Sequence, residues 1–119
     1  MTASVLVVVD DPISRAVAIQ LIVACGMTVV GEADGVATGL STAVQLKPSA
    51  ALVDVALPDG DGFTLARELI ALPWRPRVVL TSVQQNVGSP DAVRRSGAQA
   101  FVQKADLPGA PLARLHGAD

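Results

Sequence analysis

One stretch of the sequence decides the fold: residues 50–62 read AALVDVALPDGDG. Its apolar run ends at Asp54, and a turn rich in Asp and Gly follows, which ends a strand and begins a new element. We therefore expect Asp54 at the carboxyl end of a strand. In an open parallel α/β sheet ligands bind at this end, because the loops there leave a crevice and the following helices direct their N-termini toward it.

The rest of the chain alternates between strand-like and helix-like segments. Apolar runs without polar alternation are typical of strands buried on both faces of a parallel sheet, and N-cap residues mark several helix starts. Asp11 and Asp34 are predicted N-caps, and we expect Asp59 and Asp61 to serve turns and caps rather than a metal. The predicted strands are 5–9, 27–31, 50–54, 77–81 and 98–103, and the predicted helices are 13–24, 35–46, 61 or 62 to before 73, 90–96 and 107–115.

Five strands alternating with five helices predict a doubly wound α/β domain with a parallel sheet and right-handed crossovers. We expect a single domain over residues 1–119, without an output domain, because 119 residues that are half hydrophobic suffice to bury one core. A net charge of −2 argues against direct binding to nucleic acid, and no apolar run is long enough to span a membrane. With no signal peptide, and a single Cys25 expected to be buried at a helix end, the chain is predicted to be cytoplasmic.

Four of the five predicted strands end in polar or charged residues: Asp10-Asp11, Asp54, Thr81-Ser82 and Lys104. The carboxyl ends of parallel strands meet at one edge of the sheet, so three carboxylates would lie close together and repel one another by roughly 1 to 4 kcal/mol a pair. A hard divalent cation such as Mg²⁺ would offset this repulsion. Lys104 and the Thr81 hydroxyl would suit a phosphoryl group beside the metal.

This set of residues resembles the receiver domain of two-component response regulators over essentially the whole chain. The residues that carry the resemblance are Asp10-Asp11 after a Val-rich run, Asp54 followed by residues 57–63 (LPDGDGF), Thr81-Ser82, and Gly97-Ala98 leading to Phe101-Val102-Gln103-Lys104. The resemblance implies a stand-alone receiver with a flavodoxin-like sheet of strand order 2-1-3-4-5 and helices on both faces.

The resemblance also implies a role for each site residue. Asp54 would be the phosphoacceptor, and a histidine kinase or histidine phosphotransfer protein would be the donor. Asp10, Asp11, Asp54 and the backbone carbonyl of Ala56 would hold Mg²⁺ or Mn²⁺. Thr81 and Lys104 would bind the phosphoryl oxygens, and Phe101 would occupy the aromatic switch position. The chain would signal through an unidentified protein target, not as an enzyme, and a homodimer stays open.

The chain departs from the usual receiver pattern in three places. Ala105 stands after Lys104 where many receivers have Pro, and the segment 84–89 offers little to a fourth helix. Ala56 and Val83 are apolar, so neither can orient a water for hydrolysis, and we expect slow loss of the phosphoryl group.

Two other functions stay open on the sequence. One is a phosphorylation-independent interaction module that keeps the acids. The other is a metal-dependent phosphatase, which is weakened because Ala56 stands where a second Asp would be needed. The first helix is unusually apolar: if Gln20 faces water, Ala16, Ile19 and Val23 share its face and form either a docking stripe or an ordinary greasy surface.

Overall fold

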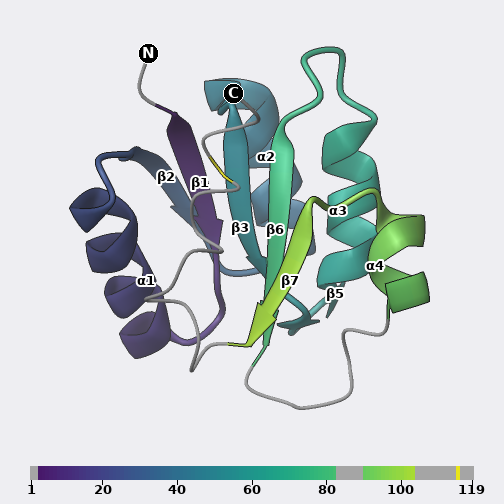
Figure 1. Cartoon of the computed structure of the whole chain (residues 1–119), viewed down its shortest axis with the longest axis horizontal. Coiled ribbons are helices and arrows are strands. Elements are labelled where there is room, and N and C mark those ends of the chain that lie inside the picture. Colours follow the sequence, from purple (N-terminus) through teal and green to yellow (C-terminus); the bar gives the residue numbers. More distant parts are fainter. Residues whose placement is uncertain (1–2, 83–89, 104–114, 116–119) are drawn as a thin grey trace.

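The computed structural model of the chain describes residues 3–82, 90–103 and 115. Five parallel strands form one sheet in the order β2-β1-β3-β6-β7, which confirms the predicted doubly wound topology (Figure 1). A separate two-stranded hairpin, β4-β5, follows β3. The strands are β1 (Ser4–Val8), β2 (Thr28–Ala33), β3 (Ala50–Asp54), β4 (Ala56–Leu57), β5 (Gly60–Asp61), β6 (Arg77–Ser82) and β7 (Ala100–Gln103).

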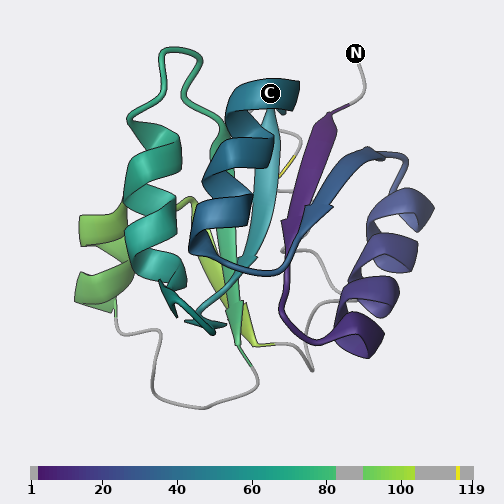
Figure 2. The same ribbon diagram turned by 180° about the vertical axis from the view of Figure 1, so that it is seen from behind.

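Helices cover both faces of the sheet. In Figure 2, α2 and α3 lie on one face, and α1 lies on the other. Ala18 and Ile22 of α1 pack against Val7 and Leu52, whereas α2 and α3 bury side chains such as Leu65 on the opposite face. The helices in the described part of the chain are α1 (Pro12–Ala24), α2 (Val36–Leu46), α3 (Gly62–Ile70) and α4 (Pro90–Ser96).

The central strands β1 and β3 are almost entirely apolar because the sheet is covered on both faces there, whereas β2 at one edge of the sheet is mostly exposed or half-buried. All five residues of β3 are buried, and β1 is buried from Val5 to Val8. Alternate residues of each strand belong to different core clusters: Val7 contributes to the α1 face and Val8 to the α2 and α3 face. This packing holds the carboxyl ends of β1, β3 and β6 side by side at one edge.

The predicted element bounds are close to those of the structure, with local differences. Strand β2 continues two residues beyond its predicted end, to Ala33, because Glu32 and Ala33 still pair with β1 after a register shift at Val30. The hairpin β4-β5 was not predicted, since each of its strands has only two residues and shows no periodicity. The segment 84–89 and most of the predicted helix 107–115 lie outside the described residues; within the latter, Leu115 is buried.

Side-chain caps fix the starts of α1 and α3 as predicted. The Asp11 carboxylate accepts a hydrogen bond from the Ser14 N–H at 2.8 Å, and Asp61 caps α3 through the Thr64 N–H at 2.8 Å. An Asp at this position satisfies an N–H that the helix itself leaves without an acceptor. Both helices therefore begin at defined residues next to the carboxyl edge of the sheet.

The predicted cap of α2 was wrong. Asp34 accepts a hydrogen bond from the Thr38 hydroxyl at 3.1 Å, and the N-cap residue is Gly35, which makes no side-chain cap. Asp59, from the β4-β5 hairpin, supplies the cap instead, because its carboxylate accepts from the N–H groups of Val36 and Ala37 at 2.7 and 3.0 Å. These two hydrogen bonds hold the pKa of Asp59 below its usual value.

One further prediction on α1 was wrong: Cys25, expected to be buried, is exposed at the C-cap of α1. Of the apolar residues expected to share one face of this helix, Ala16 and Val23 are exposed, whereas Ile19 is half-buried and packs against the core. Ile13 and Val17 are exposed as well. Among the described residues, no helix is long and apolar enough to cross a membrane.

Candidate functional site

Asp54 lies at the carboxyl end of β3, as predicted, and its side chain is buried in the rim of the sheet. Its Oδ1 accepts a hydrogen bond from the backbone N–H of Ala56 at 3.2 Å, which turns the carboxylate toward the loop that follows the strand. Ala56 itself is exposed and begins the short hairpin. Asp54 thus lies at the carboxyl edge of the sheet with only 6% of its surface exposed.

Gly62 packs directly behind Asp54. A Cβ atom built at Gly62 would lie 2.4 Å from the carbonyl oxygen of Asp54 and 2.9 Å from the Cα of Val55. The Gly62 N–H also donates to the Val55 carbonyl at 2.8 Å. These are backbone atoms, which cannot move aside as the end of a side chain can. Glycine is therefore required where α3 begins, and it fixes the position of the Asp54 peptide.

Thr81 lies beside Asp54 on the neighbouring strand. The two residues are paired in the β3-β6 register, and the Val55 N–H donates to the Thr81 carbonyl at 2.9 Å. Thr81 is fully buried, and its Oγ1 has no hydrogen-bond partner among the residues that the structure describes. A buried hydroxyl without a partner costs roughly 1 to 3 kcal/mol, so this atom would gain from an acceptor placed at the Asp54 carboxylate.

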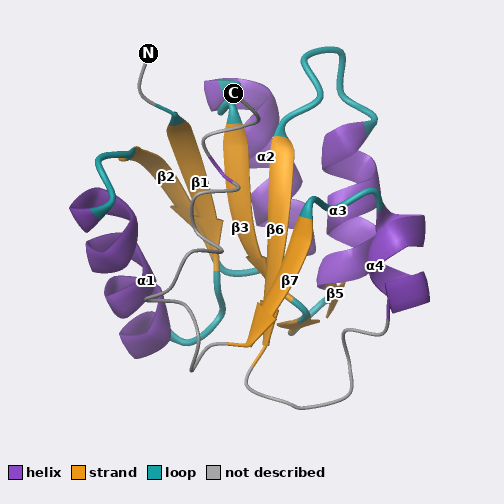
Figure 3. Ribbon diagram, in the orientation of Figure 1, coloured by secondary structure: helices purple, strands orange, loops and turns teal. Residues whose placement is uncertain are grey.

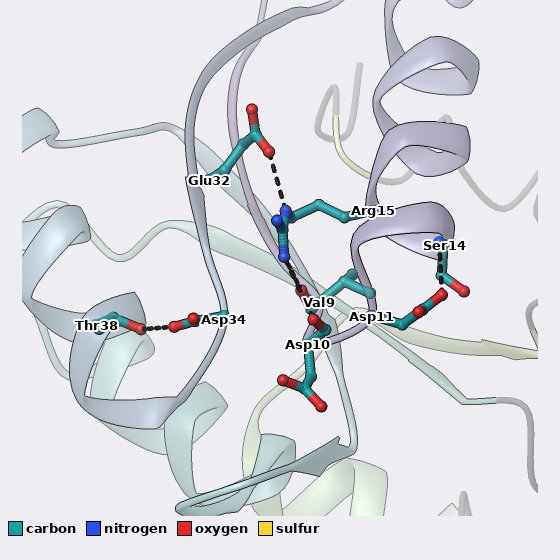
Figure 4. Close-up of polar contacts among 8 residues, drawn as sticks. All are labelled: Val9, Asp10, Asp11, Ser14, Arg15, Glu32, Asp34 and Thr38. Atoms are coloured by element: carbon teal, nitrogen blue, oxygen red, sulfur yellow. Dashed lines mark hydrogen bonds and ion pairs between the residues drawn. The ribbon is translucent and has the colours of Figure 1, made fainter.

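The acidic pair follows β1, and its two side chains diverge. Figure 4 shows the Asp11 carboxylate directed at the Ser14 N–H and the Asp10 carboxylate directed away from it. Asp10 is exposed. Because β1 pairs with β3, the residues after Val8 emerge next to those after Val53. The structure thus places Asp10 at the same edge as Asp54, whereas Asp11 serves the helix.

Arg15 holds the loop that carries this pair. Its guanidinium donates to the carbonyl of Val9 at 2.8 Å and to that of Asp10 at 3.4 Å (Figure 4). The same side chain forms an ion pair with Glu32 at 2.9 Å. Sequence analysis missed this role, since a lone Arg in the first turns of a helix gives no signal of a contact to strand carbonyls. Gly62 was missed for a similar reason, because it stood among other turn residues.

The remaining predicted site residues lie on or after β7. Phe101 is half-buried and pairs with Leu80 in the β6-β7 register, so it lies one position before the residue opposite Thr81. It packs against the core cluster on the α2 and α3 face. Lys104 lies outside the described residues.

The donor set of the carboxyl edge suits Mg²⁺. Within the described part of the chain, no group of three or more His, Cys, Asp or Glu side chains is arranged to hold a metal. Mg²⁺ does not need such a cage, because it commonly binds one or two carboxylates, waters and a substrate phosphate. Asp10 and Asp54 would supply two carboxylates from this edge, and the peptide oxygen of Ala56 would add a hard donor.

Comparison with known proteins decides the family. The family model of the response regulator receiver domain matches residues 5–110. The chain belongs to this family. Receiver domains are signalling domains rather than catalysts, which removes the support for the metal-dependent phosphatase alternative. They generally bind Mg²⁺ at the phosphorylation site, and they interact with histidine kinases or phosphotransfer proteins and with downstream targets.

The matching segments of the curated relatives are parts of longer proteins. The chain is 38% identical over 89 residues to the DNA-binding transcriptional activator DevR/DosR of Mycobacterium tuberculosis, covering 74% of this chain and 40% of that protein. It is 32% identical over 109 residues to protein-glutamate methylesterase/protein-glutamine glutaminase 4 of Myxococcus xanthus, covering 90% of this chain and 31% of that protein. The chain thus spans less than half the length of these curated relatives.

Solved structures agree on the fold. The signal receiver domain of the response regulator NarL from Mycobacterium tuberculosis superposes with a TM-score of 0.81 at 27% identity, covering 98% of both chains. The response regulator domain of CheB from Thermotoga maritima gives a TM-score of 0.84 at 22% identity, covering 100% of this chain and 99% of that chain. The fold of the receiver family is therefore present over the length of the chain.

Proposed function

We propose that the chain accepts a phosphoryl group on Asp54 from a histidine kinase or histidine phosphotransfer protein and signals through protein contacts. One observation carries the proposal: the buried Thr81 lies in register beside the buried Asp54, and within the described part of the chain its hydroxyl has no hydrogen-bond partner. An unpaired donor next to a carboxylate suits a site where new acceptor oxygens arrive. A phosphoryl group on Asp54 would bring three of them.

The reaction is a transfer between two nucleophiles. An Asp54 oxygen forms a bond to phosphorus as the bond from phosphorus to the donor imidazole nitrogen breaks, and the electron pair stays on that nitrogen, which takes up a proton. A carboxylate is a weak nucleophile, so the protein contributes mainly by positioning and by neutralising charge. The Ala56 N–H fixes the carboxylate, and Gly62 fixes the peptide behind it.

Bound Mg²⁺ or Mn²⁺ would supply positive charge to the phosphoryl oxygens. We propose that Asp10, Asp54 and the Ala56 carbonyl hold the metal. Asp11, predicted as a further ligand, would act here mainly through its negative charge while it caps α1. Arg15 would keep the Asp10 peptide in place. Lys104 would be the cation that meets the phosphoryl group.

A movement of Thr81 would be the first step of the conformational response to phosphorylation. If its hydroxyl moves toward the new phosphoryl oxygens, space opens near β6, and Phe101, which pairs with the neighbouring Leu80, would turn inward to fill it. Phe101 is half-buried already, so a modest inward rotation would change the surface beside β7. This change would be what a downstream protein detects.

The exposed apolar face of α1, formed by Ile13, Val17 and Val23, would dock the phosphodonor. Ile13 and Val17 lie near the carboxyl edge, because α1 begins directly after Asp10-Asp11, and Val23 extends the face toward the other end of the helix. Val17→Asp should therefore slow phosphotransfer from the kinase by about tenfold, the effect of a buried charge in an apolar contact. Labelling by acetyl phosphate, which needs no docking, should be unchanged. Equal loss with both donors would contradict this placement.

Borohydride trapping tests the acceptor residue. An acyl phosphate is reduced by borohydride to an alcohol, so a phosphorylated Asp becomes homoserine and can be located by peptide mass spectrometry. We expect homoserine at position 54 after incubation with phosphodonor and Mg²⁺. Homoserine at Asp10 or Asp61 instead would overturn the assignment.

A second candidate function is a receiver-like module that acts without phosphorylation. It is favoured by the engagement of Asp11 as a helix cap, which leaves fewer carboxylates for a metal than the sequence predicted. The two candidates differ in one measurable property. The phosphoacceptor requires Mg²⁺-dependent labelling, whereas the interaction module would bind its partner equally well with Asp54→Asn and without metal.

A further inference from the structure

The edge of the sheet opposite Asp54 carries a compact basic surface. The end of α2 and the loop between α3 and β6 stand together at this edge (Figures 2 and 3). The Lys47 ammonium lies 5.9 Å from the centre of the Trp74 ring, a distance at which a cation and an aromatic face attract each other. We define the basic rim by four residues: Lys47, Trp74, Arg75 and Arg77.

Hydrogen bonds hold the two loops of the basic rim in a fixed relation. The indole N–H of Trp74 donates to the Pro48 carbonyl at 3.1 Å, and the Arg77 N–H donates to the Ser49 carbonyl at 3.0 Å. Ser49 is in turn bonded to Ser4 at the start of β1. A partner would therefore meet a preorganised surface, which lowers the entropy lost on binding.

Two exposed cations of the basic rim lie at strained backbone positions. Lys47 and Arg75 have φ values of 50° and 43°, and they are the non-glycine residues with positive φ among those described. A side chain in this left-handed conformation costs about 1 kcal/mol. After α1 and α4 the chain has glycines at such positions, Gly26 and Gly97. The basic rim thus has charged side chains where glycine would fit with less strain.

The cations of the basic rim are not neutralised. Within the described residues, the ion pairs are Arg15–Glu32 and Arg94–Asp91, and neither involves the rim. Part of this charge has a local use, since a cation at the C-cap favours the helix, as Lys47 does for α2. That effect falls off within the last turn. It does not account for Arg75 and Arg77, which lie beyond the end of α3.

We propose that the basic rim docks a carboxylate-rich segment of a protein partner. Arg guanidinium groups bind carboxylates in a bidentate manner, and the half-buried Trp74 ring offers an apolar face for the stems of the acidic residues. Nucleic acid fits less well, because its binders neutralise many phosphates, while this chain carries a net charge of −2 and has three cations here. The surface lies away from Asp54, so it is distinct from the proposed phosphorylation site.

Trp74 itself provides the readout. It is the only Trp of the chain, and the chain contains no Tyr, so intrinsic fluorescence reports on the basic rim alone. The full chain is titrated with an acetylated peptide of alternating Glu and Leu, and separately with the corresponding Lys and Leu peptide. We expect a saturable change of emission with the acidic peptide, weakened by salt, and none with the basic one.

Glycine variants separate docking from folding. Lys47→Gly and Arg75→Gly remove a charge at positions where glycine relieves strain, so thermal unfolding should show that both variants stay folded. Each should raise the dissociation constant for the acidic peptide about fivefold. Arg67→Gln is the control. It also removes one positive charge, but Arg67 lies on α3 outside the basic rim and donates a hydrogen bond to the Thr64 hydroxyl, so binding of the peptide should be unchanged.

Four results would overturn the proposal. The first is an emission that stays constant when the acidic peptide is added. The second is that the glycine variants bind this peptide as tightly as the unaltered chain does. The third is that a single-stranded oligonucleotide binds more tightly than the peptide, which would assign the surface to nucleic acid. The fourth is self-association in sedimentation that the glycine variants abolish, which would assign the surface to a second copy of the chain. None of these measurements involves Asp54, so they leave the proposed phosphoacceptor role unaffected.

Discussion

At the residue scale, the backbone of Gly62 packs closely against the Asp54 peptide, and only glycine leaves room for this contact. Gly62→Ala places a methyl group 2.4 Å from the Asp54 carbonyl, and the strand cannot retreat because both its faces are packed. We expect a loss of about 3 kcal/mol in the free energy of unfolding, measured with urea, and slower labelling of Asp54.

Gly26→Ala is the control for this substitution. Gly26 has a φ of 85°, but a Cβ there meets nothing within 4 Å, so conformational strain alone remains. That strain should cost about 1 kcal/mol and leave labelling unchanged. Equal losses for the two variants would show that contact with the Asp54 peptide is not what constrains Gly62.

We propose that the Thr81 hydroxyl is used only once Asp54 is phosphorylated. Thr81→Val removes a buried donor that has no partner among the described residues and keeps the shape of the side chain. We expect the free energy of unfolding to rise by about 1 kcal/mol. The same variant should lose the conformational response to phosphorylation, which amide chemical shifts of β7 would detect. A destabilised variant would mean that the hydroxyl is already engaged in the resting protein.

We propose that Asp10 binds the metal while Asp11 caps α1. Asn substitutions can distinguish these two roles. Asn caps helices as well as Asp, so Asp11→Asn keeps the hydrogen bond to the Ser14 N–H and loses only charge. We expect Asp10→Asn to raise the Mg²⁺ concentration for half-maximal labelling about tenfold or more, and Asp11→Asn to raise it less. The opposite order would make Asp11 the metal ligand.

At the scale of elements, the features that could be predicted were those determined by residues close together in the sequence. Strand β3 could be predicted because an apolar run ends abruptly at Asp54, and the caps of α1 and α3 because Asp11 and Asp61 stand directly before helical segments. The cap of α2 could not, because Asp59 comes from a hairpin that is distant in sequence. Cys25 was misjudged since its exposure depends on where α1 ends over the sheet.

The same distinction applies to the candidate site. The strand ends that carry Asp54 and Thr81 follow from topology, because parallel strands in this order must bring those ends together. The divergence of Asp10 and Asp11 depends on which residue the first turn of α1 takes as its cap, and the sequence allowed both uses. The contact of Arg15 with the Val9 carbonyl depends on a side-chain rotamer, which no sequence pattern records.

Helix α2 provides a pH-dependent test at this scale. Its cap, Asp59, has a pKa lowered below the usual value of 3.8 by the Ala37 and Val36 N–H groups. A folded-state pKa below the unfolded value means that the stabilisation is present above about pH 4 and is lost as the pH falls through the folded pKa. Asp59→Asn, which does not titrate, should flatten the decline of the urea midpoint between pH 4 and pH 2. An unchanged slope would contradict the cap.

At the scale of the whole molecule, charge is divided between the two edges of the sheet. The carboxyl edge carries Asp10, Asp54 and the capping acids, whereas the amino edge carries the basic rim. The parallel topology keeps the two groups of residues apart, because the loops after the strands lie at one edge and the loops before them at the other. We propose that the first edge binds the metal and the phosphoryl group and that the second contacts an acidic partner.

The most direct test of the central claim is intact mass after incubation with acetyl phosphate, with and without Mg²⁺. The unaltered chain and Asp54→Asn are compared under the same conditions. Phosphoryl acceptance on Asp54 predicts a gain of one phosphoryl group that requires the metal and is absent from Asp54→Asn. An equal gain in both proteins would contradict it, and so would no gain from acetyl phosphate or from a purified histidine kinase.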